Sequence, residues 1–286
     1  MPPCCNSSRS TSAGRCFPNP EVMRNVFTLN RYGFLMRRFL LAALLPGAWA
    51  CQTPPGREVP RPWPPIATFS ILAMDSATGE IGGAVQSRVF SVGNGVLWAE
   101  AGVGAAATQA IVDVSYGPQA IALLKQGLSA EKVVAMVMDA DPDPRPNDWS
   151  KQGRQFAVID AKGKVFAFTG PKATEWAGHR SCSAGHHCTA QGNILAGAAV
   201  VDSMVIAYER TAGQHISLRL MEALEAGQRA GGDKRGMQSA AMLVVGKGRG
   251  VWLNNDVVLR LQVDDNPEPI VELRRLVERA ARQRRR

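Results

Sequence analysis

The sequence predicts a mixed α+β domain in which β-sheets are covered by pairs of helices. The composition is that of a globular protein, with 45% hydrophobic and 20% charged residues among 286. The expected elements run along the chain as strands, two helices, strands, two helices and strands. Because the helices come in pairs, the chain does not follow an alternating βαβ pattern. Either two sheets or one mixed sheet, with helix pairs packed outside, is therefore expected.

The first half of this domain is expected to form a hairpin, a third strand and two helices. Apolar runs on either side of the turn segment Asp75–Gly79 predict the hairpin, and a run of small apolar residues predicts the third strand. Apolar residues at helical spacing predict both helices, the second of which begins at Ser129 as its N-cap. In order, these elements cover residues 68–74, 80–87, 102–109, 116–126 and 129–138.

The second half repeats this order. Alternating Asp and Pro predict a loop over 139–148, and a second hairpin turns at Ala161–Gly163. Gly231 and Gly232 end the second helix of the next pair, and an Arg-rich helix begins near Pro269. The remaining strands and helices are expected at 154–160, 164–169, 194–211, 215–230, 238–245 and 258–263.

The positive charges lie at the two ends of the chain. The net charge is +9, yet residues 1–50 hold six Arg against one Glu, and residues 274–286 hold seven Arg against one Glu. The segment between them holds 20 Lys plus Arg against 22 Asp plus Glu. A nucleic-acid-binding domain normally carries a basic face on the fold itself, so nucleic acid is not an expected partner.

The N-terminal segment has the pattern of an export signal. Met36-Arg37-Arg38 is followed by the apolar run Phe39–Leu45 and the small-residue end Pro46–Ala50. We expect residues 1–50 to combine a mis-assigned start with this signal, and Met36 to be the true start. The mature protein is then periplasmic or secreted. Residues 51–66 form a Pro-rich linker, residues 67–277 a single domain and residues 278–286 an Arg-rich tail.

Cys51 follows Ala50 directly, at the position where a bacterial lipoprotein is cleaved and lipidated. A lipoprotein box usually has Leu three residues before the Cys, where this chain has Ala48. Ordinary cleavage after Ala50 fits equally well. Both a membrane tether through Cys51 and a chain without a lipid therefore stay open.

Cys182 and Cys188 are the two cysteines within the expected domain. In an oxidising compartment, a pair six residues apart in a loop predicts a local disulfide. The alternative is zinc, because His179, His186 and His187 lie beside the two cysteines. This spacing matches no standard zinc motif, so we expect neither a metal site nor a cofactor.

The chain contains no phosphate loop, dinucleotide fingerprint, HExxH helix or GxSxG elbow, which leaves the common cofactor-dependent and hydrolase classes unsupported. Polar residues instead stand among small ones at strand ends. At such positions they would line a pocket with fixed donors and acceptors, or they would cap turns and helices, as Asn193 would for a helix starting at Ile194. The candidate binding residues are Gln86, Ser87, Thr108, Gln109, Gln191, Asn193, Asp233, Arg235, Gln238 and Ser239.

Several ordered blocks of sequence carry a family resemblance. They are Thr68-Phe69-Ser70-Ile71, Gly83-Ala84-Val85-Gln86-Ser87-Arg88, Ala101-Gly102-Val103-Gly104, Thr108-Gln109-Ala110, Tyr116-Gly117-Pro118, Trp176-Ala177-Gly178-His179, Gln191-Gly192-Asn193-Ile194-Leu195, Gly231-Gly232-Asp233-Lys234-Arg235-Gly236, Gln238-Ser239-Ala240 and Val263-Asp264-Asp265. Together they resemble the domain of unknown function 1028 family over Thr68–Val277. That family is classed with the N-terminal nucleophile hydrolases, which implies a four-layer α-β-β-α sandwich.

The resemblance implies that Thr68 is an N-terminal nucleophile acting on a small amide or peptide. Its free amine would serve as general base, with oxyanion donors drawn from Gln86, Ser87, Thr108 and Asn193. This chemistry requires cleavage of the Ala67–Thr68 bond after export. The chain departs from the pattern in two places. Threonine proteases of this superfamily use a nearby lysine to tune the nucleophile, but no Lys precedes Lys125, and Asn266 stands where the family would have His. The alternative function is a non-catalytic envelope binding protein for a small amide, a peptide or a cell-wall fragment. A homo-oligomer is compatible with both.

Overall fold

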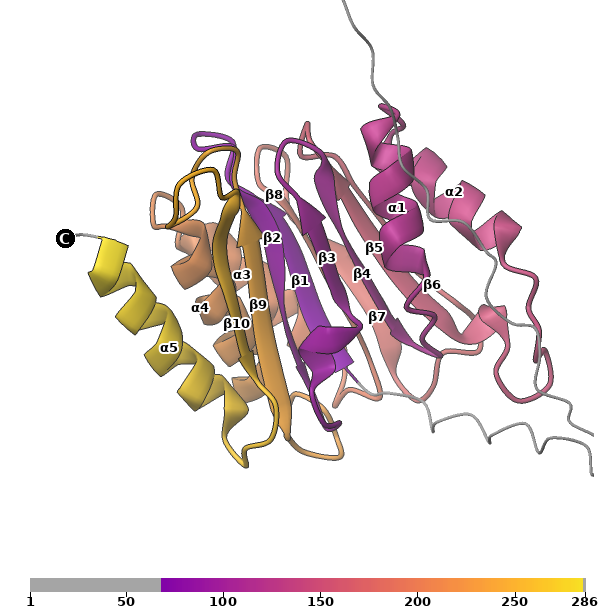
Figure 1. Ribbon diagram of the computed structural model, residues 1–286. Coiled ribbons are helices and arrows are strands. Elements are labelled where there is room, and N and C mark those ends of the chain that lie inside the picture. Colours follow the sequence, from indigo (N-terminus) through magenta and orange to yellow (C-terminus); the bar gives the residue numbers. More distant parts are fainter. Residues whose placement is uncertain (1–67, 285–286) are drawn as a thin grey trace, which may run out of the picture. The chain divides into compact units, whose positions relative to one another are not determined.

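The computed structural model describes residues 68–284. Two β-sheets pack face to face, and each is covered on its outer side by helices (Figure 1). The six-stranded sheet carries α3 (Ala199–Arg210), α4 (Ile216–Arg229) and α5 (Pro269–Arg284), and the four-stranded sheet carries α1 (Tyr116–Lys125) and α2 (Ala130–Ala140). This confirms the expected α-β-β-α sandwich.

All strand pairs in both sheets are antiparallel. The six-stranded sheet has the order β10-β9-β2-β1-β8-β7, and the four-stranded sheet has the order β3-β4-β5-β6. The first strand of the described chain therefore lies at the centre of the larger sheet. The strands are β1 (Thr68–Met74), β2 (Ile81–Ser87), β3 (Leu97–Glu100), β4 (Gly104–Ala110), β5 (Arg154–Asp160), β6 (Val165–Thr169), β7 (Ala177–Ser181), β8 (His187–Asn193), β9 (Ser239–Val245) and β10 (Val257–Val263).

The four layers enclose three apolar cores, and the two-residue period of a strand divides the side chains between them. On β1, Phe69 and Ile71 belong to the core beneath α3, α4 and α5, whereas Leu72 belongs to the core between the sheets. A third core lies beneath α1 and α2 and includes Phe156 of β5. Since both faces of the central strands are covered, apolar residues occupy consecutive positions and do not simply alternate with polar ones.

Some glycines are required by close packing between strands. A Cβ on Gly82 of β2 would lie 1.9 Å from the carbonyl oxygen of Leu243 on β9, where real Cβ atoms are never found. A Cβ on Gly117 of α1 would likewise lie 2.1 Å from the indole of Trp98 on β3. The absence of a side chain at these two positions therefore lets β2 pair closely with β9 and lets α1 pack closely on the four-stranded sheet.

Most of the expected elements are present, and the expected cap of α2 is confirmed because the Ser129 side chain accepts a hydrogen bond from the Lys132 N–H. The helix expected over 194–211 begins only at Ala199. Asn193 is the last residue of β8, so its proposed role as a helix N-cap is wrong. The chain turns sharply at Ile194, whose φ is +54°, before the helix can start.

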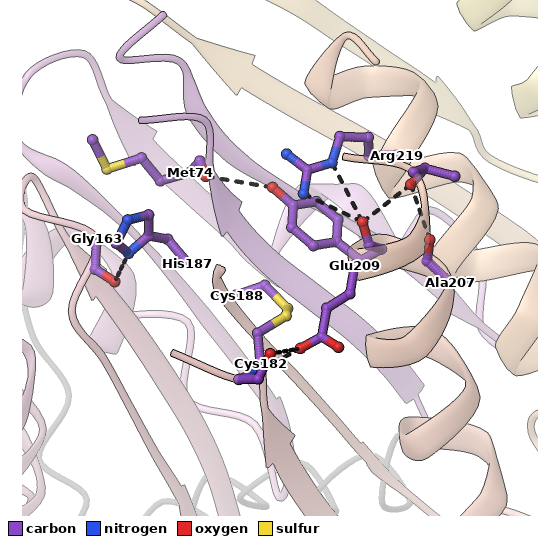
Figure 2. Close-up of a disulfide and its surroundings, with 11 residues drawn as sticks. Met74, Gly163, Cys182, His187, Cys188, Ala207, Glu209 and Arg219 are labelled. Carbon is purple, nitrogen blue, oxygen red and sulfur yellow. Dashed lines mark hydrogen bonds between the residues drawn. A yellow bond between two sulfur atoms is a disulfide. The ribbon is translucent and has the colours of Figure 1, made fainter. Parts of the chain in front are cut away.

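The strands β3, β7 and β8 were not expected. The β7–β8 hairpin is rich in His, Ser and Cys, which hides the alternation of a strand. A disulfide joins Cys182, just after β7, to Cys188 on β8, and the two Cα atoms lie 5.2 Å apart. Figure 2 shows this disulfide beside Glu209 of α3, whose carboxylate accepts hydrogen bonds from the N–H and Oγ of Ser183 (2.6 and 2.8 Å).

The disulfide engages both sulfur atoms that the zinc alternative required. One ring nitrogen of His187 lies 3.1 Å from the Gly163 carbonyl oxygen (Figure 2). Within residues 68–284, no group of three or more His, Cys, Asp and Glu is arranged to hold a metal ion. The proposed signal segment, the Pro-rich linker and Cys51 lie outside the described residues.

At the other end of the chain, the expected Arg-rich tail is part of a longer element. Helix α5 continues without a break from Pro269 to Arg284, so no structural boundary falls at residue 278. None of the helices within 68–284 is long and apolar enough to cross a bilayer.

Candidate functional site

Four polar residues form a row across one end of the six-stranded sheet. Thr68 begins β1 and pairs in register with Ser87 at the end of β2 and with Asn193 at the end of β8. Ser87 in turn pairs with Ser239, the first residue of β9. Because neighbouring strands are antiparallel, the start of one strand lies beside the end of the next. This register brings together residues that are as much as 171 positions apart in sequence.

Thr68 lies at the centre of this row and is completely buried. Its Oγ1 donates a hydrogen bond to Ser87 Oγ across the strand pair, at 3.1 Å. Its carbonyl oxygen accepts a hydrogen bond from Nε2 of Gln109 on β4, at 3.2 Å. Thr68 is therefore held by its side chain within its own sheet and by its backbone from the facing sheet.

Glutamine side chains connect the two sheets next to Thr68. Gln191 Nε2 donates to Ser70 Oγ, and Ser70 Oγ donates to Gln109 Oε1, both at 2.7 Å. Gln109 Nε2 then donates to Gln155 Oε1 at 2.7 Å. Each group donates in the same direction along the chain of bonds, so the orientation of every amide is determined by its neighbours.

The chain of bonds continues outward through β5 to the β7 edge. Gln155 Nε2 lies 2.9 Å from Thr169 Oγ1 and also donates to the carbonyl oxygens of Gly178 and Gly192. Thr169 Oγ1 lies 2.9 Å from Nδ1 of His179. The surroundings of the His179 ring desolvate its charged form and lower its pKa, although part of the residue is exposed. A neutral ring can accept a hydrogen bond from the Thr169 hydroxyl at Nδ1.

Two buried acceptors next to this network have no hydrogen-bond partner among the described residues. They are Gln191 Oε1 and Thr189 Oγ1, which stand two positions apart on the same face of β8. Buried polar atoms are usually hydrogen-bonded, so unused acceptors in an interior are uncommon. This end of the sheet interface could accept hydrogen bonds from the N–H or O–H groups of a ligand.

A charged group borders the row beyond Ser87. The carboxylate of Asp233 is buried, accepts the backbone N–H of Arg88 at 3.2 Å and pairs with the Arg235 guanidinium at 3.1 Å. Its other oxygen accepts the Arg235 backbone N–H at 2.8 Å. Asp233 thereby holds the segment after β2 against the segment before β9, and its charge is already neutralised by a partner.

The structure separates the sequence-predicted residues by strand face. On β2, Ser87 faces the sheet interface, whereas its neighbour Gln86 faces the helix layer. On β4, Gln109 faces the sheet interface, whereas its neighbour Thr108 faces the other helix layer. Gln86 Nε2 donates to the Gly236 carbonyl at 3.4 Å, and Thr108 Oγ1 donates to the Asp113 carbonyl at 3.1 Å. Gln86 and Thr108 are therefore wrongly placed to assist Thr68 as oxyanion donors.

Two further predicted residues have structural contacts, and three network residues were not predicted. Gln238 Nε2 donates to Asp265 Oδ1 at 3.1 Å, and Ser239 Oγ donates to the Val89 carbonyl at 2.6 Å.

The residues that sequence reasoning missed are Ser70, Gln155 and Thr169. Their signal in the sequence is a single polar residue inside or at the end of an apolar strand, where burial leaves it in need of a partner.

The comparisons with known proteins agree with the sequence resemblance. The model of a family described as "Family of unknown function (DUF1028)" matches residues 68–273. The crystal structure of a DUF1028 protein from Silicibacter pomeroyi is 31% identical, with a TM-score of 0.65, over 75% of this chain and 86% of that one. No curated protein matches the chain.

Two Anbu (ancestral beta-subunit) structures show much weaker similarity. Anbu from Yersinia bercovieri is 8% identical with a TM-score of 0.36, over 75% of this chain and 95% of that one. An Anbu mutant from Hyphomicrobium sp. strain MC1 is 13% identical with a TM-score of 0.33, over 76% and 95%. The family match covers most of the chain and includes the whole row around Thr68, so this protein is a member of the DUF1028 family.

Proposed function

We propose that the protein is an amide or peptide hydrolase of the N-terminal nucleophile type, with Thr68 as the nucleophile. The observation that carries this proposal is the position of the Thr68 hydroxyl. Thr68 is the first residue of a central strand, and its Oγ1 lies 3.1 Å from Ser87 Oγ at the polar end of the sheet interface. A hydroxyl at the start of a central strand can lie next to its own amine once the preceding bond is cut.

The proposed reaction needs one processing step and two chemical steps. Cleavage of the Ala67–Thr68 bond frees the Thr68 amine, which then takes the proton from Oγ1 as general base. Oγ1 attacks the carbonyl carbon of the substrate amide, the C–N bond breaks, and the leaving amine takes up that proton. Water then hydrolyses the resulting ester and releases the acid, which restores the Thr68 hydroxyl.

The other polar residues have positioning roles in this proposal. Ser87 Oγ accepts a hydrogen bond from Thr68 Oγ1, and Gln109 Nε2 donates one to the Thr68 carbonyl oxygen at 3.2 Å, so both restrict where the nucleophile can lie. The partnerless acceptor on Gln191 would receive an N–H of the substrate. A small, neutral amide fits this environment because the network consists of uncharged hydroxyl and amide groups.

We also propose that the protein works outside the cytoplasm. The charged and apolar segments of residues 36–50 are typical of an export signal, and processing at Thr68 would follow export. Lipidation of Cys51 would tether the unprocessed chain, and cleavage at Thr68 would then release the domain from the membrane.

The decisive measurement is the intact mass and N-terminal sequence of the protein recovered from its native envelope or medium. A chain beginning at Thr68 would support the hydrolase and justify a screen of amide substrates, in which Thr68→Ala should be inactive. A chain that begins at Cys51, with no Thr68 N-terminus in any fraction, would overturn it. Turnover by Thr68→Ala would equally exclude Thr68 as the nucleophile.

A non-catalytic binding protein is the second candidate. The observation that favours it is the complete burial of Thr68, together with the absence of any Lys before Lys125 in the sequence. Such a protein would use the same acceptors to bind a small amide, a peptide or a cell-wall fragment. Calorimetry that shows heat of binding, while mass spectrometry recovers the ligand unchanged, would favour this function.

A further inference from the structure

The loop between β9 and β10 exposes three consecutive apolar side chains. Val251, Trp252 and Leu253 are 59%, 77% and 93% exposed. Single exposed apolar residues are ordinary on protein surfaces, but three large ones in a row on one loop are not. The exposed apolar area calls for a contact that covers it.

The loop has a defined conformation that presents these side chains. The Gly250 N–H donates to the Asn255 carbonyl at 2.8 Å, and the Asn255 N–H donates to the Trp252 carbonyl at 3.1 Å. Asn254 adopts a positive φ of +58°, which closes the turn. Residues 251–254 are therefore the tip of a closed loop, which we call the apolar tip.

An ionic cluster around the buried Glu80 carboxylate attaches the base of this loop to the domain. Arg249 Nε donates to Glu80 Oε1 at 3.0 Å, and His215 Nε2 lies 3.3 Å from Glu80 Oε2. Burial alone would raise the pKa of Glu80, but hydrogen bonds and charge from His215 and Arg249 outweigh it and hold this pKa below its ordinary value. The Glu80 carboxylate is thus charged at neutral pH and keeps the loop in place.

Basic residues lie at the base of this loop and on the neighbouring end of α5. Lys247 lies in the same loop, and the C-terminal part of α5 lies at the same end of the molecule (Figure 1), where Ala281 lines a pocket together with Gly248 and Arg249. Arg279 and Arg282 are exposed on this part of α5. Neither Lys247 nor Arg279 forms an ion pair with any described residue, and the sequence continues as three arginines, 284–286.

We propose that the apolar tip and the basic end of α5 form a docking surface for an anionic phospholipid bilayer. Trp and Leu at a protruding tip suit the boundary between headgroups and acyl chains, and the flanking Lys and Arg suit anionic headgroups. A protruding tip, unlike a flat patch, can enter a fluid bilayer without needing a complementary partner surface.

This surface lies at the opposite end of the strands from Thr68. The apolar tip follows the end of β9 and lies beside the β1–β2 turn, which Arg249 contacts through Glu80, whereas Thr68, Ser87 and Ser239 lie at the other strand ends. Docking through the apolar tip would turn the row around Thr68 away from the membrane. The proposal does not depend on hydrolase activity or on lipidation of Cys51.

Partition of the full chain into vesicles tests the proposal. We expect binding to vesicles containing phosphatidylglycerol to exceed binding to pure phosphatidylcholine and to weaken with salt. The double variant W252S/L253S should bind about tenfold less tightly or worse, and R279Q/R282Q should lose part of the preference for anionic lipid. All variants retain the same N-terminal segment, so differences between them report on this surface alone.

Phe90→Ser is the matched control, since Phe90 is 66% exposed and follows β2 at the opposite end of the sheet. It should bind vesicles as the unchanged chain does. Equal vesicle binding by W252S/L253S and the unchanged chain would overturn the proposal. A change of oligomeric mass in W252S/L253S, with no vesicle binding by the unchanged chain, would also overturn it and assign the apolar tip to a protein contact.

Discussion

The substitution Gln109→Leu tests whether the glutamine network holds the two sheets together. Gln109 is completely buried and takes part in three hydrogen bonds, with Ser70 Oγ, the Thr68 carbonyl and Gln155 Oε1. Leucine fills a similar volume but can bond to none of them. The substitution therefore leaves one donor and two acceptors without that partner inside the protein, on both sides of the sheet interface.

The expected loss follows from the cost of each orphaned group. A buried polar atom that loses its partner costs about 1–3 kcal/mol, and the apolar gain from leucine offsets part of the sum. We expect a loss of about 3–5 kcal/mol in the free energy of unfolding. For a domain of this size, that corresponds to a fall of roughly 10 °C in the melting temperature.

Urea unfolding followed by circular dichroism measures this loss directly. Gln119→Leu is the matched control, because Gln119 is exposed on α1 and its change should stay within about 0.5 kcal/mol. The double variant Gln109→Leu/Gln155→Leu should lose less than the sum of the two single variants, since the residues share a bond. A Gln109→Leu protein within about 1 kcal/mol of the unchanged chain would show that these hydrogen bonds do not hold the two sheets together.

Three further predictions follow from buried charges and the disulfide. Asp141→Ala should cost about 3–5 kcal/mol in urea unfolding, since it leaves the buried Arg154 guanidinium without its carboxylate at 3.3 Å; a loss below about 1 kcal/mol would contradict this role. For both Asp141 and Glu80, burial alone would raise the pKa. Hydrogen bonds and nearby positive charge outweigh this effect, so each pKa lies below its ordinary value of 3.8 or 4.5. Their stabilisation is present above those ordinary values and is lost as the pH falls through the folded-state pKa values. As the pH falls below about 4.5, the urea midpoint should therefore decrease less for Glu80→Gln than for the unchanged chain. Parallel curves of urea midpoint against pH for the two proteins would contradict this role of Glu80. Replacing both Cys182 and Cys188 by Ser should cost about 2 kcal/mol, because the bond closes a short loop with a separation of 6 residues, and equal stability of the oxidised and reduced protein would argue against it.

Local patterns in the sequence determined the element order, the family and the place of Thr68 at the start of a strand. The paired helices and apolar strands are properties of neighbouring residues, and the Ser129 cap needs three residues of context. The same local logic was wrong at Asn193, because the positive φ of Ile194 ends β8 in a turn before α3 can begin. The β7–β8 hairpin was missed because its polar and Cys residues hide the strand pattern.

The tertiary structure decided which polar side chains meet. Adjacent residues on a strand point to opposite faces, so Ser87 and Gln109 enter the sheet interface while Gln86 and Thr108 do not. Which face is interior depends on how two sheets stack, and which residues align depends on the register between strands far apart in sequence. Composition, hydropathy and spacing carry no record of either. Polar residues at strand ends can thus be predicted from the sequence. That Gln155 completes the network depends on how the sheets pack, because its hairpin lies far from Thr68 along the chain.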